Sequence, residues 1–362
     1  MVATRSGAWS HCRRLFRTVA CVTGLLAPSL AAHAAPSAPV VAPAYAVVAR
    51  YAIGGPGGRD YLLADAVSGH LFVSRSDRVL VVNMADGSLA ATIAGTGGVH
   101  GIALAREIGR GCTSNGRVDD VTVFDLVTLK RAGTIAVGGH NPDAILYDKA
   151  SKRLFTFNGR SKDVSVIDPL AGKMLATIPA GGKPECAVAD DKGSIFFNIE
   201  DTGELARIDA RAAKLMARWK LEDCEDPYGL AFDQVRHRLF SVCQNGKMAV
   251  TDSSSGKAVA RVAIGKGPDA AAYDAQRGLV FSCNDDDGTL TVVKQVDADH
   301  YTVAQNLATQ RSARTLALDP QSHRIYLVAA KFGPKPEPTS QQPHPRAPVL
   351  DGSIEILVVD GR

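Results

Sequence analysis

Short runs of apolar residues alternate with polar turns along the chain from about residue 45 onward. The segment Asp163–Asp168, for example, reads Asp-Val-Ser-Val-Ile-Asp, with apolar and polar residues at alternate positions. A period of two is typical of a β-strand. Glycine, asparagine and aspartate separate the apolar runs, so the pattern predicts antiparallel hairpins.

A unit of about forty residues recurs seven times, and each copy opens on aspartate or its replacement before an apolar strand. The opening residues are Asp65, Arg106, Asp148, Asp190, Asp233, Asp274 and Asp319, with spacings of 41, 42, 42, 43, 41 and 45 residues. Short strands at that period are the signature of β-propeller blades. We therefore predict an all-β fold, a seven-bladed β-propeller with four antiparallel strands in each blade.

The two ends of the chain predict how the ring closes. The third unit has all four strands, which we expect at 144–148, 153–158, 163–168 and 173–179. The last unit stops after its third strand, whereas residues 45–53 have the pattern of a fourth strand. We expect this N-terminal strand to complete the last blade, which leaves the ring without a long free edge.

The first residues have the pattern of a secretory signal. Four arginines precede an apolar run from Val19 to Ala32, and the sequence Ala32-His33-Ala34 has small residues at the cleavage positions. We expect a signal peptide over 1–34 with cleavage after Ala34, a linker over 35–44 and a single propeller over 45–362. The protein is then periplasmic or secreted, with no membrane insertion; adjacent arginines at 13–14 leave twin-arginine export open.

Charge argues against one class of partner. The chain has 41 Lys and Arg against 37 Asp and Glu, and four of the basic residues belong to the predicted signal. The remaining chain therefore has 37 of each sign. Because a nucleic acid or an anionic membrane binds a surplus of basic residues on one surface, we expect neither as a partner. We also expect the protein to be a monomer.

The repeated strand-turn pattern, most complete at residues 153–184, resembles the YVTN-type (YncE-like) β-propeller repeat proteins of bacteria over about residues 45–362. The resemblance implies the fold but no activity, because propellers host many unrelated functions. Two features depart from the type. The chain lacks a literal Tyr-Val-Thr-Asn string, and its last blade carries a proline-rich loop over 331–350. This loop could cover the channel or dock another protein, or it could be a surface loop without function.

Candidate binding residues come from the loops that share one face of a propeller, before the first strand and between the second and third. Register places Asp60, Asp143, Glu185, Tyr228, Asp269 and Arg314 at one level around the channel mouth, with Arg59 and His100 one step outward. Four carboxylates, two guanidiniums, a phenol and an imidazole would form a pocket for a cation, an amine or a polar metabolite. Carboxylates that close would perturb one another's pKa values. Alternatively, these groups cap strand starts, pair with one another and face water.

Five cysteines follow the predicted signal, and an odd number leaves at least one thiol free. Cys224 precedes a first strand and Cys243 ends the second, positions that face each other in an antiparallel hairpin. We expect a disulfide between them, with two buried thiols as the alternative. The family resemblance supports the pair, since Cys-x-x-Pro followed by a cysteine after Leu-Phe recurs among YncE-like relatives.

These patterns favour an exported, non-enzymatic propeller that binds a protein partner or a small polar ligand at the channel mouth. The alternative is a propeller enzyme, resembling a lactonase or a cofactor-assisted oxidoreductase; nucleic-acid binding is a third hypothesis. Neither Cys-x-x-Cys-His nor His-Glu-x-x-His occurs in the sequence. We therefore expect no cofactor and no metal site.

Overall fold

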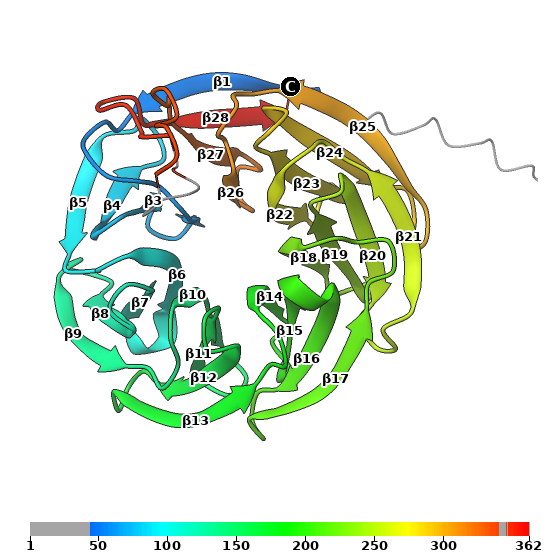
Figure 1. The fold of residues 1–362 in the computed structure, drawn as a ribbon, viewed down its shortest axis with the longest axis horizontal. Coiled ribbons are helices and arrows are strands. Elements are labelled where there is room, and N and C mark those ends of the chain that lie inside the picture. Colours follow the sequence, from blue (N-terminus) through cyan, green and yellow to red (C-terminus); the bar gives the residue numbers. More distant parts are fainter. Residues whose placement is uncertain (1–43, 340–344, 346, 362) are drawn as a thin grey trace, which may run out of the picture. The chain divides into compact units, whose positions relative to one another are not determined.

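Seven four-stranded antiparallel sheets follow one another around a central channel (Figure 1). The computed structural model describes residues 44–339, 345 and 347–361. The sheets confirm the predicted seven-bladed β-propeller. The predicted signal peptide at 1–34, and the predicted linker at 35–44 except for its last residue, lie outside the described residues. Within the described ranges, no helix has the length and apolar character needed to cross a membrane.

The blades are numbered here in chain order, each from the channel outward. Blade 1 contains β2 (Leu62–Asp65), β3 (His70–Arg75), β4 (Arg78–Asn83) and β5 (Leu89–Ala94), and blade 2 contains β6 (Val99–Ala105), β7 (Arg110–Asn115), β8 (Asp120–Asp125) and β9 (Arg131–Ala136). Blade 3 contains β10 (Pro142–Asp148), β11 (Arg153–Asn158), β12 (Asp163–Asp168) and β13 (Lys173–Pro179), and blade 4 contains β14 (Pro184–Ala189), β15 (Ser194–Ile199), β16 (Glu204–Asp209) and β17 (Lys214–Lys220).

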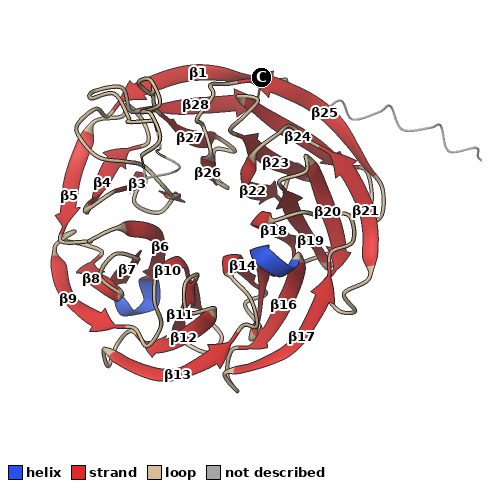
Figure 2. Cartoon of the chain, viewed as in Figure 1, coloured by secondary structure: helices blue, strands red, loops and turns tan. Residues whose placement is uncertain are grey.

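The remaining three blades follow the same plan. Blade 5 contains β18 (Pro227–Asp233), β19 (Arg238–Cys243), β20 (Lys247–Asp252) and β21 (Ala258–Ala263), and blade 6 contains β22 (Pro268–Asp274), β23 (Leu279–Asn284), β24 (Thr289–Gln295) and β25 (Tyr301–Ala308). Blade 7 contains β26 (Thr315–Leu318), β27 (Ile325–Ala329), β28 (Glu355–Gly361) and β1 (Tyr45–Ala52). Two short 3-10 helices lie in connections between the described strands, η1 (Arg106–Ile108) between β6 and β7 and η2 (Glu200–Thr202) between β15 and β16 (Figure 2).

The N-terminal strand completes the last blade, as predicted. Strand β1 pairs antiparallel with β28, from Tyr45 opposite Gly361 to Ala52 opposite Glu355. Tyr45 is buried, and its ring meets Phe281 of blade 6 edge to face, with 5.2 Å between centroids. Strand β1 therefore joins its own blade and also stabilises the contact with the preceding one.

The core lies between neighbouring blades. The two middle strands of a blade are covered on both sides, so that every residue of β15 and β23 is buried. The outermost strand has one face in solvent, and β17 alternates exposed and half-buried residues. Contacts such as Phe157 with Phe197, 5.3 Å between ring centroids, join one blade to the next. This burial explains why the middle strands read as apolar runs and the outer ones as alternating patterns.

A buried asparagine at the end of the second strand fixes the next turn. Asn158 Nδ2 donates to Asp163 Oδ1 at 2.6 Å and to Ser165 Oγ at 2.8 Å, and its Oδ1 accepts from Thr156. Asn115 and Asn284 make equivalent bonds in blades 2 and 6. Since buried polar atoms without partners are destabilising, the complete set of bonds specifies one conformation for each hairpin.

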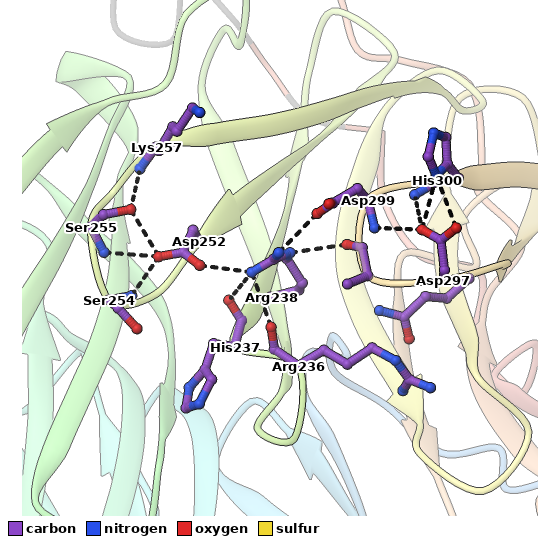
Figure 3. A network of polar contacts seen from close by, with 12 residues as sticks. Arg236, His237, Arg238, Asp252, Ser254, Ser255, Lys257, Asp297, Asp299 and His300 are labelled. Atoms are coloured by element: carbon purple, nitrogen blue, oxygen red, sulfur yellow. Dashed lines mark hydrogen bonds and ion pairs between the residues drawn. The ribbon is translucent and has the colours of Figure 1, made fainter. Parts of the chain in front are cut away.

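Polar contacts also join the turns on the opposite face. Arg238, on β19 of blade 5, donates to Asp252 at 2.7 Å and to Asp299 at 2.8 Å (Figure 3). Its Nε donates to the carbonyl of Ala298 at 2.9 Å. Asp299 and Ala298 belong to the turn between β24 and β25 of blade 6, so this arginine links two blades.

One predicted repeat boundary is wrong by a residue. We expected Arg106 to replace the opening aspartate of the second unit. Strand pairing instead sets Ala105 opposite Arg110, as Asp148 is set opposite Arg153 in blade 3. Arg106 lies one position later and forms an ion pair with Asp65 of blade 1. The positive charge of Arg106 therefore stabilises the contact between blades 1 and 2, and it does not replace the aspartate of the turn.

Candidate functional site: a polar cavity at the channel mouth

One position of the repeat supplies a polar side chain to the channel mouth in every blade. It is the second residue of β6, β10, β14, β18 and β22, and it lies two residues before β2 and one residue before β26. We call this set the mouth ring: Asp60, His100, Asp143, Glu185, Tyr228, Asp269 and Arg314. All seven line a cavity of about 630 Å³, as does Arg59, so the structure brings the eight predicted residues together.

The mouth ring corrects the expected place of His100. Counting back from Arg106 as the start of its repeat predicts a place one step outward. With Ala105 in that role, His100 falls at the same level as Asp143. Its ring reaches Asp60 directly.

Strand irregularities lie beside the mouth ring positions. The pairing of β10 with β11 shifts register between Pro142 and Ile145, on either side of Asp143. Corresponding shifts occur at the same place in β6, β14, β18 and β22. A bulge releases a residue from the regular ladder and can redirect its side chain. The repeated bulge therefore places these side chains apart from the interblade core.

A buried arginine holds the loop that carries Arg59 and Asp60. The Arg75 side chain is fully buried and donates to three carbonyl oxygens of that loop, those of Gly54 (2.8 Å), Gly55 (2.9 Å) and Gly58 (2.9 Å). Burial lowers the pKa of Arg75 to about 10. Because these carbonyls need donors once they leave water, Arg75 gives a glycine-rich loop a defined course.

Asp60, His100 and Asp143 form the first group in the cavity, which we call the acid–imidazole cluster. His100 Nδ1 lies 2.5 Å from Asp60 Oδ2 and 3.8 Å from Asp143 Oδ1. Burial disfavours the charged imidazole, but the bond to Asp60 and the charge of Asp143 outweigh it and raise the pKa of His100 to about 9. Burial raises the pKa of Asp143. No described residue donates a hydrogen bond to the Asp143 carboxylate.

A second group surrounds Lys183, which our residue selection missed. Lys183 Nζ lies 2.9 Å from Glu185 Oε1 and also pairs with Glu200, whose other oxygen accepts from the Tyr228 hydroxyl at 3.0 Å. Burial and the nearby Asp143 raise the pKa of Glu185. Lys183 precedes Glu185 by two residues, in the loop already assigned to this face. Its opposite charge so close to a selected carboxylate was a signal that could have identified it. Glu200 comes from η2, an irregularity that the repeat does not reveal.

Two arginines form the third group. Arg314 makes a two-pronged ion pair with Asp269, at 2.8 and 3.0 Å. Arg59 donates to the carbonyl of Ser312, and its guanidinium lies 5.3 Å from the ring centre of Phe332, in the proline-rich loop. Burial lowers the pKa of Arg59. Its Nε is buried and has no hydrogen-bond partner among the described residues.

Below the ring, Tyr61 extends from blade 1 toward blade 4. Its hydroxyl lies 3.4 Å from Cys186 Sγ. Burial raises the pKa of both groups. Tyr61 also lines the cavity, with Asp285 and Asp286 from the loop between β23 and β24. None of these three residues was selected from the sequence, and the repeat does not predict how far the Tyr61 phenol reaches across the ring.

The predicted disulfide is confirmed. Cys224 and Cys243 are bonded, and they join the start of blade 5 to the end of β19. Cys112, Cys186 and Cys283 are free thiols.

The cavity as a whole carries more acid than base. Six carboxylates line it, against three permanently cationic side chains and His100. Lys183 and Arg314 already have acidic partners. The surplus of negative charge is therefore concentrated on the acid–imidazole cluster and on Asp285 and Asp286, which favours a cation at the mouth.

These features define the protein as a seven-bladed β-propeller with a polar cavity at one end of its channel. No family model matches the chain, and no curated protein matches it. Its fold is similar to that of hydrazine synthase from Kuenenia stuttgartiensis, with a TM-score of 0.66 and 14% identity, over 75% of this chain and 92% of that one. It is also similar to U3-55K, with a TM-score of 0.70 and 9% identity, over 84% and 97% of the two chains. At such identities the likeness shows the fold alone.

Proposed function

We propose that this propeller binds a small polar ligand in the cavity at the channel mouth. The observation that carries the proposal is the cavity itself, about 630 Å³ in volume and lined by at least one polar side chain from each blade. That volume suits a metabolite rather than a protein segment. The buried Nε of Arg59, which lacks an acceptor among the described residues, favours a ligand with acceptor oxygens.

The test is a binding screen. The purified full chain is titrated calorimetrically with small hydroxycarboxylates, amino acids and monosaccharides, after a thermal-shift survey of the same compounds. At least one compound should bind with a stoichiometry of one, and Arg59→Gln should weaken it about tenfold or more. Arg236→Gln, at a half-exposed arginine on the opposite face, is the matched control. The proposal fails if none binds, or if both variants bind like the original chain.

Catalysis is a second candidate, favoured by the 2.5 Å contact between His100 and Asp60. A carboxylate that orients an imidazole is a common arrangement for general acid–base chemistry. A lactonase-like enzyme would hydrolyse simple lactones, and His100→Ala would abolish the turnover. If the folded protein hydrolyses no lactone at any pH between 5 and 9, catalysis is rejected and ligand binding is the remaining candidate function.

The resemblance to YVTN-type repeat proteins and the export of the chain remain proposals too. The Cys224–Cys243 disulfide supports export, since such bonds persist in oxidising compartments. Sequencing the N-terminus of the protein from a periplasmic fraction tests it, with cleavage after Ala34 as the expected result. Recovery of the uncut chain in the cytoplasm would contradict it.

A further inference from the structure

We propose that Asp60, His100 and Asp143 together bind a divalent transition-metal ion. One ligand atom from each residue lies within 4.8 Å of the others. The three side chains occupy the same mouth ring position in three consecutive blades. The fold therefore aims them at one point without any motif that is continuous in sequence. This site goes beyond the binding of an organic ligand and does not depend on it.

The ligand types select the kind of ion. Two carboxylate oxygens and one imidazole nitrogen suit Zn²⁺ and neighbouring transition metals. Calcium and magnesium prefer all-oxygen surroundings, and an imidazole among three ligands disfavours them. Three protein ligands also leave at least one coordination position open, as in zinc sites that bind water or substrate.

The distances fit such an ion with small side-chain adjustments. Ligand atoms about 2.1 Å from a tetrahedral Zn²⁺ lie about 3.4 Å from one another. In the structure His100 Nδ1 is 2.5 Å from Asp60 and 3.8 Å from Asp143, on either side of that value. All three side chains are between 19 and 28% exposed, so an ion can reach them from the cavity.

The other cations of the cavity have partners of their own. Lys183 is held by Glu185 and Glu200, and Arg314 by Asp269. Asp143 has no hydrogen-bond donor among the described residues, and its nearest cation is His100, whose Nδ1 lies 3.8 Å away. A divalent ion would displace the proton from His100 Nδ1 and place two positive charges between the carboxylates of Asp60 and Asp143. An organic ligand with an oxygen donor could then occupy the open position and also accept from Arg59.

The same face contains a natural comparison. His140 Nδ1 lies 2.8 Å from Asp119 Oδ2, but this pair is joined by no third ligand of the right type in the described part of the chain. Its imidazole is 66% exposed. A histidine–aspartate pair alone should not hold an ion tightly, so His140 provides a matched control for His100.

The test is metal titration of the full chain, purified without a histidine tag and stripped with EDTA. Zn²⁺ should bind calorimetrically with a stoichiometry of one, and Co²⁺ should give a visible d–d absorption band. His100→Ala and Asp143→Asn should each weaken binding about tenfold or more. His140→Ala and Asp119→Asn, which remove the two members of the comparison pair, should stay within about twofold.

The proposal is overturned if neither ion binds saturably, or if His100→Ala and Asp143→Asn bind as tightly as the controls. Circular dichroism and thermal melting without metal establish that each variant is folded, and Asp60→Asn replaces any variant that is not. Repeating the organic ligand screen on stripped protein separates the two proposals. If an organic compound binds and no metal does, the metal proposal is overturned and the proposed function is supported.

Discussion

Gly229 shows how closely neighbouring blades approach one another at the channel. A Cβ atom at this position would lie 2.6 Å from the Cα of Ala270 on the next blade. Gly101 is similarly restricted by Asp143 and Ile145. Both follow a mouth ring residue directly, where small side chains let the innermost strands meet. The spacing of the site residues therefore depends on glycines that touch no ligand.

We predict that Gly229→Ala lowers the free energy of unfolding by about 1 to 3 kcal/mol, because the backbone of blade 6 must move to make room. Gly133→Ala is the control, since a Cβ there would meet nothing within 4 Å. That variant should stay within about 0.5 kcal/mol of the original chain. Urea unfolding measures both, and equal effects of the two substitutions would contradict the close approach.

Single residues also mark the limit of prediction from sequence. The forty-residue period correctly predicted which position of each repeat reaches the mouth, because backbone geometry is repeated. It misplaced His100 by one step, since the second unit has Ala105 where the others have an acidic residue. It could not reveal Lys183 with Glu200, or Tyr61 with Cys186. Those contacts depend on side-chain length and on approach across the ring, which no repeat encodes.

At the scale of elements, the disulfide ties the entry of blade 5 to its second strand. It spans 19 residues of sequence. Closing a loop of that length restricts the unfolded chain by about 3 kcal/mol in the chain-entropy account. We predict a loss of that order in Cys224→Ser/Cys243→Ser, measured by urea unfolding. Reductant should destabilise the original chain similarly and leave the double variant unchanged; insensitivity of both would argue against the bond.

Arg238 carries a second link between elements, from β19 to the turn between β24 and β25 (Figure 3). Its side chain is only 13% exposed, and both of its acidic partners would lose a donor. We predict that Arg238→Ala lowers the free energy of unfolding by about 1 to 2 kcal/mol. Arg236→Ala, whose side chain is 45% exposed, should change it by less than about 0.5 kcal/mol. Equal melting temperatures for the two variants would show that the link contributes nothing.

Element boundaries were the easier part of the sequence to interpret. The four strands of blade 3 were predicted to within two residues, because each lies between turn-forming residues and repeats in neighbouring units. The first strand begins at Pro142 rather than at residue 144, since its bulge interrupts the apolar pattern. Bulges change backbone direction without changing residue type, and for that reason periodicity does not detect them.

At the scale of the whole molecule, the ring is held closed by the pairing of β1 with β28. A chain that begins at residue 54 lacks this strand, exposes the edge of β28 and loses the buried ring of Tyr45. We predict a loss of at least about 3 kcal/mol in the free energy of unfolding, together with a greater tendency to aggregate. A chain that begins at residue 44 should melt like the original chain after signal removal. Equal melting temperatures for the two truncated chains would contradict closure by β1.

The same closure sets the order in which the protein can fold. Strand β1 leaves the ribosome before the other described strands, yet its partner β28 is the last of them to be made, more than 300 residues later. Blades 1 to 6 each consist of strands consecutive in sequence and can assemble from local contacts, whereas blade 7 cannot form until β28 has been made. Completion of the ring is therefore a late step of folding. Until then β1 has no partner strand and β27 has an unpaired edge. At this stage the chain is most exposed to aggregation, and a chaperone would help it most.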